Sequence, residues 1–495
     1  MRSTILKSLS DSGIYVAALI LTSMAAFISV PIYTRLFDPH EYGYLALAIA
    51  TLSVLNVFAS GAVSSAVIRF LPRFHQSKSE GEFYVSSFLT NSVFTLIVAV
   101  SSLLIVYFMR SFLSVTLYKL LIMVPVVLVA ASSFDFFLSL LRARQDSIRY
   151  AILLVANRFL SLFVGLFLVL VLHKGVFGVL LGIFLTHLLL DAAILALVLR
   201  RQLDFHKFKL VTAIVRKIAV YGLPLIFSLL AHWILSTSDR YILQFLRGGV
   251  EVGVYSISYD LSFKSMSLVT APFITALTPA IVRIWEHNRK EAADILKRLS
   301  LFYFMFCLPA LAGFNALAHQ IIRVFATPPY FSGQAVFPFI STGIIFMGMY
   351  SISYTGLLVY EKSGVIAKTL LFCAFTNVVL NFLLIPSYGF LGAGISTLLA
   401  YFAAFVIASL LSSKYLQWQP DSKGFMKILL SSILMGVIVH VLSNVIFDTS
   451  VLSLIIEISI GISVYLFLLH VLRVIHIREV KRFFLEARFL IFPSG

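Results

Sequence analysis

Residues 12–34 read SGIYVAALILTSMAAFISVPIYT, a run that contains no charged residue. At about 1.5 Å per residue, a helix of this length reaches roughly 35 Å, which is enough to cross a hydrocarbon core of about 30 Å. The run is too long for the core of a signal peptide and has no small-residue cleavage site. We therefore predict that it is a retained membrane-spanning helix.

Apolar runs of similar length recur along the rest of the chain. The thirteen further predicted spans are 44–68, 84–108, 115–140, 150–172, 175–199, 218–238, 252–281, 299–318, 336–359, 364–385, 390–412, 426–446 and 451–472. Pro and Gly occur inside several of them, which membrane helices tolerate because neighbouring helices satisfy the freed backbone groups. The sequence predicts an all-α polytopic membrane protein of about fourteen helices.

The composition supports a membrane protein and argues against other classes. Hydrophobic residues make up 60% of the chain and charged residues 12%, about half the share of a soluble domain. The net charge of +17 falls in short tracts between apolar runs, so it builds no basic domain for nucleic acid. Cys307 and Cys373 both lie inside apolar runs, which predicts neither a disulfide framework nor a metal site.

The basic residues also predict how the helices are oriented. With a cytoplasmic N-terminus, the inner segments carry 28 Lys and Arg residues, including Lys427 at the cytoplasmic end of the span 426–446, and the outer loops carry 6. Lys and Arg concentrate on the cytoplasmic side of membrane proteins. The alternation never inverts along the chain, so we predict that both termini are cytoplasmic.

Two local matches predict an internal duplication. Residues 41–44 resemble 251–255 at an offset of 210, and residues 177–182 resemble 388–392 at an offset of 211. Six helices per repeat is an even number, so the two lobes would have the same orientation. The basic loop 200–217 would be the hinge between them. The predicted domains are an N-terminal lobe 1–210, a C-terminal lobe 211–412, and two helices with a basic tail, 413–495.

Few ionisable residues fall inside the predicted spans, and each is a candidate for function. Asp260 and Lys264 are spaced i, i+4, so they share one face of the helix 252–281. Lys264 would lie roughly 18 Å from the start of that span, close to the middle of the membrane. The pair is either a cationic group of a central cavity held by Asp260 or a neutralised pair that only packs.

The other candidates have weaker positions. Asp135 and Arg158 lie on consecutive helices joined by a short loop, so they could form an interhelical pair or face a cavity. Arg35 and Arg240 stand at helix ends, where an arginine ordinarily extends toward the interface. Tyr255 and Tyr259 are one turn apart beside Asp260 and could contact a sugar, although packing is the more ordinary role for a tyrosine.

Catalytic and nucleotide-binding motifs are absent from the sequence. There is no GxxxxGK[ST] phosphate loop and no HExxH zinc motif. The longest predicted outer loop, about 319–335, offers little ionisable chemistry. We therefore predict no enzymatic activity, no catalytic residues, no metal and no cofactor.

Four stretches resemble a known family. They are PIYTRLFDPHEYGY (31–44), SDRYIL (238–243), EVGVYS (251–256) followed by Pro279, and IPSYGFLGAG (385–394). Their order and spacing resemble the polysaccharide transporter family of the multidrug/oligosaccharidyl-lipid/polysaccharide exporter superfamily, the group that contains the O-antigen flippases.

This resemblance implies two six-helix lobes around a central cavity, with two further helices at the C-terminus. It also implies a flippase for an undecaprenyl-diphosphate-linked oligosaccharide in the bacterial or archaeal cytoplasmic (inner) membrane. Its partners would be membrane lipids, H⁺ or Na⁺ as a coupling ion, and the polysaccharide polymerisation machinery. Asp135, Asp191 and Asp260 could each bind a proton or Na⁺, and the sequence does not select among them. Related flippases use basic cavity residues to hold the diphosphate. Lys264 matches that role, whereas helix 12–34 has no basic residue before Arg35.

Two alternatives remain open from the sequence. A drug or small-cation exporter of the same superfamily would favour acidic groups in the cavity. A membrane enzyme of glycan assembly would need a catalytic cluster on the outer face, and the sequence offers no such cluster.

Overall fold

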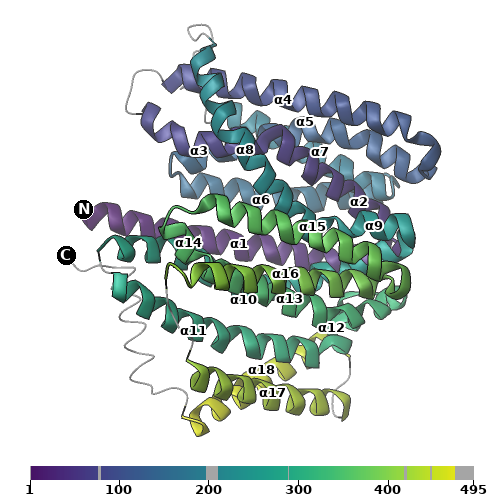
Figure 1. Ribbon diagram of the computed structural model, residues 1–495. Helices are drawn as coiled ribbons and strands as arrows, with labels where there is room; N and C mark the ends of the chain where they lie inside the picture. Colours follow the sequence, from purple (N-terminus) through teal and green to yellow (C-terminus); the bar gives the residue numbers. More distant parts are fainter. Residues whose placement is uncertain are drawn as a thin grey trace. The chain divides into compact units, whose positions relative to one another are not determined.

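Helices form all the regular structure in the part of the chain that the structure describes (Figure 1). The structure is a computed structural model that describes residues 2–75, 80–196, 210–287, 289–416, 421–445 and 449–473. Within hydrocarbon a chain must satisfy its backbone polar groups internally, and a helix does so within one segment. The all-α architecture expected from the apolar runs is confirmed.

The α-helices are α1 Arg2–Leu36, α2 Pro39–Asn56, α3 Ala62–His75, α4 Glu80–Phe108, α5 Val115–Ala143, α6 Ser147–Leu170, α7 Val176–Ile194, α8 Thr212–Thr237, α9 Asp239–Leu246, α10 Gly249–His287, α11 Arg289–Ala316, α12 Ala318–Phe325, α13 Phe337–Ser353, α14 Thr355–Val359, α15 Ser363–Tyr388, α16 Phe390–Ser412, α17 Ser422–Val445 and α18 Val451–Val471. Three short elements join them, the π-helix η1 Val57–Gly61 and the 3-10 helices η2 Arg110–Phe112 and η4 Pro328–Val336.

Thirteen helical segments in the described residues are long and apolar enough to cross a membrane, and the chain is a multi-pass membrane protein. They correspond to thirteen of the fourteen predicted spans. The remaining predicted span, 252–281, lies within α10, a single helix of 39 residues. α10 carries Glu251, Asp260 and Lys264 and is not among the thirteen.

Two predicted segments have more structure than expected. The predicted span 44–68 is interrupted by η1, which begins directly after Asn56. Single π-turns inside α-helices frequently mark functional positions. The predicted loop 319–335 folds into α12 and η4, and this connector binds the end of α1. Thr34 donates to the Phe325 carbonyl at 3.2 Å, and Thr327 donates to the Thr34 carbonyl at 2.8 Å.

The chain divides into two compact units. Unit 1 comprises Met1–Ser10, Val30–Pro39 and Ile242–Gly495, and unit 2 comprises Asp11–Ser29 and His40–Tyr241. The predicted lobes 1–210 and 211–412 remain predictions, as does the third domain 413–495. Residues 200–209 of the predicted hinge and the basic tail from 474 onward lie outside the described residues.

Each unit has its own apolar core, and large apolar side chains also cover its outside. In unit 2, Phe83, Phe134 and Phe136 are almost fully buried between α3, α4 and α5. In unit 1, Tyr303 is fully buried and donates to the Ile345 carbonyl at 2.9 Å. Leu96 of α4, by contrast, is 63% exposed, as expected of a side chain that faces lipid rather than water.

The local structure of the two predicted repeats corrects their alignment. Gly175 begins α7 with φ +53°, and Gly389 begins α16 with φ +56°. Three residues later, a Cβ on Gly178 would meet the backbone of α6, and one on Gly392 would meet the backbone of α15. The equivalent glycines are therefore 214 residues apart, not 211. Glycines are common at helix starts, which explains why a local match also occurs at the shorter offset of 211.

Candidate functional site

The predicted pair on α10 is formed. Lys264 Nζ lies 3.0 Å from Asp260 Oδ2, one turn earlier on the same helix. Both side chains are partly accessible, at 18% for Lys264 and 33% for Asp260. Lys264 lies fifteen residues after Gly249, the first residue of α10, so it is about 22 Å along the helix axis. The Lys264 ammonium is therefore a partly accessible cation near the middle of α10 in unit 1.

The other predicted residues of unit 1 differ in accessibility. Tyr255 is 0% exposed and Tyr259 is 5% exposed, and their rings lie 5.9 Å apart on α10. Both therefore pack within the unit in this conformation. Arg35, at the end of α1, is exposed and donates to the Pro31 carbonyl at 2.7 Å. Its exposure agrees with an arginine that extends to the interface.

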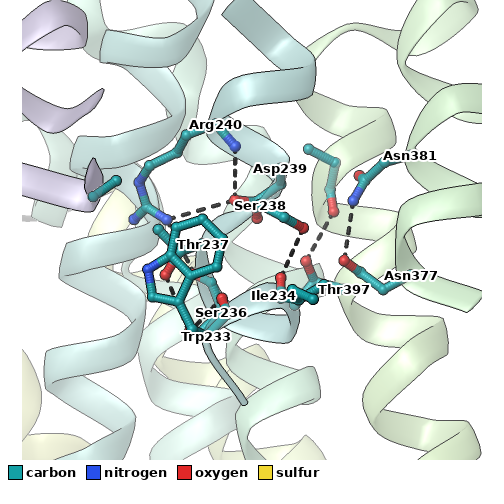
Figure 2. Close-up of polar contacts among 12 residues, drawn as sticks. Trp233, Ile234, Ser236, Thr237, Ser238, Asp239, Arg240, Asn377, Asn381 and Thr397 are labelled. Atoms are coloured by element: carbon teal, nitrogen blue, oxygen red, sulfur yellow. Dashed lines mark hydrogen bonds and ion pairs between the residues drawn. The ribbon is translucent and has the colours of Figure 1, made fainter. Parts of the chain in front are cut away.

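Arg240 does not extend outward as a helix-end arginine ordinarily does. It is 7% exposed, and it lies beside Asp239, which is 1% exposed. Figure 2 shows the Arg240 guanidinium turned back to the Ser236 carbonyl, to which it donates at 3.0 Å. Arg240 Nη1 also lies 3.5 Å from Asp239 Oδ1. The two charges are thus held inside unit 2.

Tyr241, the residue after Asp239 and Arg240, holds this segment against α2. The Tyr241 hydroxyl lies 2.8 Å from the Thr51 hydroxyl of α2, and burial raises the pKa of Tyr241 to about 12. Tyr241 therefore stays a neutral hydrogen-bonding group that ties the start of α9 to α2 within unit 2.

The expected ion pair between Asp135 and Arg158 is not formed. The amide of Asn56 donates to Asp135 Oδ2 instead. The π-helix η1 begins at the next residue and packs against α5. Arg158 on α6 is exposed, and it is close enough to Asp135 for an electrostatic interaction. Sequence reasoning missed Asn56, since a neutral amide gives no charge signal.

Two further polar residues of unit 2 lie close to this contact. His187 and Asp191 stand one turn apart on α7, and each is 8% exposed. Asp191 interacts electrostatically with Asp135, and the His187 ring lies 5.1 Å from Phe134, the residue before Asp135. His187 Nδ1, Asp191 Oδ1 and Asn56 Oδ1 are buried and find no hydrogen-bond partner among the described residues. Unit 2 therefore contains two carboxylates and incompletely bonded polar atoms, an arrangement that suits uptake of a proton.

Unit 1 contains a second polar pair that the sequence did not single out. Asn381 donates to Asn377 Oδ1 at 3.1 Å on α15, as Figure 2 shows, and both residues are almost fully buried. In the described part of the chain, Asn377 Nδ2 and Asn381 Oδ1 have no hydrogen-bond partner. The signal that could have found them is their i, i+4 spacing, which places two amides on one helical face.

Comparison with known sequences indicates a family. The profile of the family described as "Polysaccharide biosynthesis protein" matches residues 8–285, more than half of the chain. The MatE family profile matches residues 224–383. An uncharacterized membrane protein of Methanocaldococcus jannaschii is 24% identical over 269 residues, covering 54% of this chain and 53% of that protein. The chain thus spans about half the length of this curated relative.

Solved structures share the fold over most of the chain. The lipid II flippase MurJ in an inward closed conformation matches with a TM-score of 0.75 and 18% identity, covering 91% of this chain and 97% of that one. An inward-facing multidrug resistance MATE family transporter matches with a TM-score of 0.59 and 17% identity, covering 84% and 94%. A MOP superfamily transporter from Pyrococcus furiosus matches with a TM-score of 0.55 and 17% identity, covering 83% and 95%. The fold expected from the resemblance is confirmed.

Proposed function

This chain belongs to the polysaccharide biosynthesis protein family, and from that premise we propose that it is a flippase rather than an enzyme. Its substrate would be an undecaprenyl-diphosphate-linked oligosaccharide, such as an O-antigen unit. The flippase would move this lipid from the inner to the outer leaflet of the cytoplasmic (inner) membrane, with both termini of the chain in the cytoplasm. Polymerisation machinery would then receive the lipid at the outer face.

The observation that carries this proposal is Lys264. It is a partly accessible ammonium about 22 Å along α10, held by Asp260 at 3.0 Å. A diphosphate carries negative charge that cannot enter hydrocarbon unaided. A cation at this depth can replace part of the water around the diphosphate while the polyprenyl chain remains in lipid. The structurally similar MurJ is named a lipid II flippase, which also favours a lipid-linked substrate.

Rocking of one lobe against the other would expose the substrate site to each side in turn, as in transporters built from repeats. We assign the coupling-ion site to the neighbourhood of Asp135 and Asp191. Both carboxylates lie in unit 2, are held among buried polar groups and interact electrostatically. A proton or Na⁺ bound there would lower the cost of two adjacent negative charges. Transport would then be driven by the gradient of that ion.

A drug or small-cation exporter is a weaker candidate. The MatE profile matches part of the chain, but the partly accessible pair on α10 offers an ammonium as well as a carboxylate. An organic cation would be repelled by the ammonium. Transport of a cationic dye but not of lipid-linked sugars would favour this candidate over the flippase.

The proposal is tested by purified protein in liposomes that contain a fluorescent undecaprenyl-diphosphate-linked oligosaccharide. We expect substrate to appear in the opposite leaflet with wild-type protein and with Lys264→Arg, but not with Lys264→Ala. Lys368→Ala is the matched control, because Lys368 also lies in a predicted span but is exposed. Unchanged flipping by Lys264→Ala would remove Lys264 from the site, and absence of flipping by wild-type protein would contradict the function.

A further inference from the structure

The last two helices, α17 and α18, pack against each other and lie beside α12 (Figure 1). Glu457 of α18 is 1% exposed. Gln320 Nε2 of α12 donates to Glu457 Oε1 at 2.7 Å and to Ser443 Oγ of α17 at 3.0 Å. Gln320 and Ser443 are themselves 3% and 7% exposed. Three helices therefore contribute one polar side chain each to a buried cluster, here named the Glu457 cluster.

The Glu457 cluster is closed to water by close helix packing. Gly461 follows Glu457 by one turn on α18, and a Cβ at Gly461 would lie 3.1 Å from a Val439 methyl group and 3.3 Å from the Met435 sulfur of α17. Because α17 comes this close to Gly461, no layer of solvent fits between α17 and α18 there. An ionised group at Glu457 would therefore lack the water that stabilises charge.

The hydrogen bonds of the Glu457 cluster are unbalanced. Within the part of the chain that the structure describes, Glu457 Oε2 and Gln320 Oε1 are both buried without a hydrogen-bond partner. The side-chain nitrogen of Gln320 donates to both Glu457 and Ser443. An ionised Glu457 would bury a negative oxygen with no donor. A proton on Oε2 removes the charge and turns the unpartnered acceptor into a hydroxyl donor. Protonation of Glu457 therefore removes a buried negative charge that no donor at Oε2 compensates.

Among the described side chains, no charged group forms an ion pair with Glu457. On α12, His319 Nδ1 lies 3.2 Å from Gln334 Oε1, and the Arg323 guanidinium lies over the Phe331 ring. On α17, His440 is placed between the Ala316 carbonyl and Asn444. The remaining such groups on α11, α17 and α18 are Arg289, Lys290, Glu291, Asp294, Lys297, Arg298, Tyr303, Cys307, Lys423, Lys427, Tyr465 and His470.

Most of these groups lie far from Glu457 along the helices. The charged residues of α11 and the lysines of α17 occupy the first turns of those helices, whereas the cluster lies near the last turn of α17. The Tyr465 hydroxyl donates to the Met305 carbonyl at 2.7 Å. Asp448, in the connection before α18, lies outside the described residues.

We propose that Glu457 is a proton-binding site that controls how α12 packs against α17 and α18. The bound proton keeps the Glu457 cluster neutral and closed. Its release to water leaves a carboxylate at the interface of three helices, which weakens the packing of α12. Because the connector after α12 binds Thr34 at the end of α1, the proton also controls how firmly that end is held. The site binds a proton whatever substrate the protein moves.

The bound proton is detected by infrared spectroscopy of the purified full-length protein. A protonated carboxylic acid has a carbonyl stretching band separate from that of a carboxylate. We expect part of this band at neutral pH to be lost in Glu457→Gln and retained in Glu361→Gln, a control at an exposed glutamate. If Glu457→Gln leaves the band unchanged, Glu457 is ionised and the proposal fails. This measurement needs no transport, so it is independent of the flippase assignment.

Hydrogen exchange of α12 tests the structural consequence. After correction for the intrinsic rate of amide exchange, hydrogen exchange of the backbone amides of Ala318–Phe325 should become faster as pH rises in the wild type. In Glu457→Gln it should stay constant. The same pH profile in both proteins would overturn the control of α12. If Glu457→Gln does not fold, Gln320→Leu is used instead. It removes the donor to Oε1, so the acid band should shift in frequency, and an unshifted band would contradict the proposal.

Discussion

The backbone N–H of Phe390 donates to Glu251 Oε2 at 2.9 Å. Glu251 opens α10 and Phe390 opens α16, so this bond joins two of the four stretches that resemble the family. Arg247 Nε holds the same carboxylate at 3.1 Å. An anionic side chain at a helix N-terminus satisfies free N–H groups and favours the helix dipole. Glu251 thus caps α16 in this structure.

We predict that Gly389→Ala destabilises unit 1. Gly389 has φ +56°, and a Cβ there would lie 2.4 Å from Glu251 Oε2. A non-glycine residue in this region costs about 1–3 kcal/mol, and the clash would also displace the cap. Thermal unfolding in detergent should show a lower midpoint for Gly389→Ala than for the wild type. Gly364→Ala is the control, since nothing lies within 4 Å of a Cβ at Gly364. Equal midpoints for the two variants would contradict the prediction.

We predict that Asp260→Asn impairs flipping less than Lys264→Ala does. Lys264 would contact the diphosphate, whereas Asp260 would only hold Lys264 at 3.0 Å. A lost hydrogen bond to a charged group costs about 1.5–3 kcal/mol, or roughly 10-fold to 150-fold in affinity. The measurement is the rate of flipping in liposomes at limiting substrate.

A charge swap distinguishes contact with substrate from packing. The double variant Asp260→Lys with Lys264→Asp keeps a pair at the same spacing but moves the cation by one turn. We expect it to stay inactive, because the ammonium no longer lies at the depth of Lys264. Restored flipping, together with equal effects of the two single variants, would show that the pair only packs.

We predict that Asp191→Asn uncouples transport from its driving ion. Asp191 is 8% exposed and interacts with Asp135, so its amide would imitate a carboxyl that is permanently protonated. Coupling free energies of about 1–3 kcal/mol correspond to a 5-fold to 150-fold effect. We expect gradient-driven flipping by Asp191→Asn to decrease by about 5-fold to 150-fold, while flipping without a gradient persists.

The choice of gradient identifies the ion. Wild-type liposomes are given a pH gradient or a Na⁺ gradient separately, and only the coupled ion should accelerate flipping. Asp146→Asn is the control, because Asp146 caps α6 and pairs with exposed Arg149 at 3.2 Å. An Asp191→Asn protein that keeps its full response to the gradient would exclude Asp191 from coupling.

We predict that Lys362 faces the cytoplasm and that Lys174 faces the outside. Both are in short connections whose basic content gave the predicted topology, in which inner segments carry 28 Lys and Arg residues and outer loops carry 6. Single cysteines at these positions would be labelled by an impermeant reagent, Lys174→Cys in intact cells and Lys362→Cys only after permeabilisation. Native Cys307 and Cys373 are buried, so they give little background. The reverse pattern would invert the predicted orientation.

The sequence predicts correctly those features that depend on the residues of a single helical segment. Long apolar runs can cross a membrane only as helices, so the spans were readable from composition. The i, i+4 spacing of Asp260 and Lys264 on a helix is enough to place them in contact, and the 3.0 Å ion pair confirms it. The resemblance to the family was also carried by short local stretches.

Sequence reasoning failed where partners come from different helices. Asp135 was predicted either to pair with Arg158 or to face a cavity, and nothing in the sequence indicated that the amide of Asn56 donates to it. Glu457 is 1% exposed and accepts a hydrogen bond from Gln320, a partner that no feature of the sequence near Glu457 indicates. No local pattern reports which face of a membrane helix meets protein and which meets lipid.

The sequence by itself determined the membrane class, the helical spans and the spacing of charges along each helix. These follow from hydropathy and the helical period, which act within a single segment. The tertiary structure decided which buried polar groups meet, because Asn56 and Asp135 are 79 residues apart and Gln320 and Glu457 are 137 apart. An apolar run has nearly the same hydropathy on all its faces, so packing between helices, rather than the pattern along them, selects those partners.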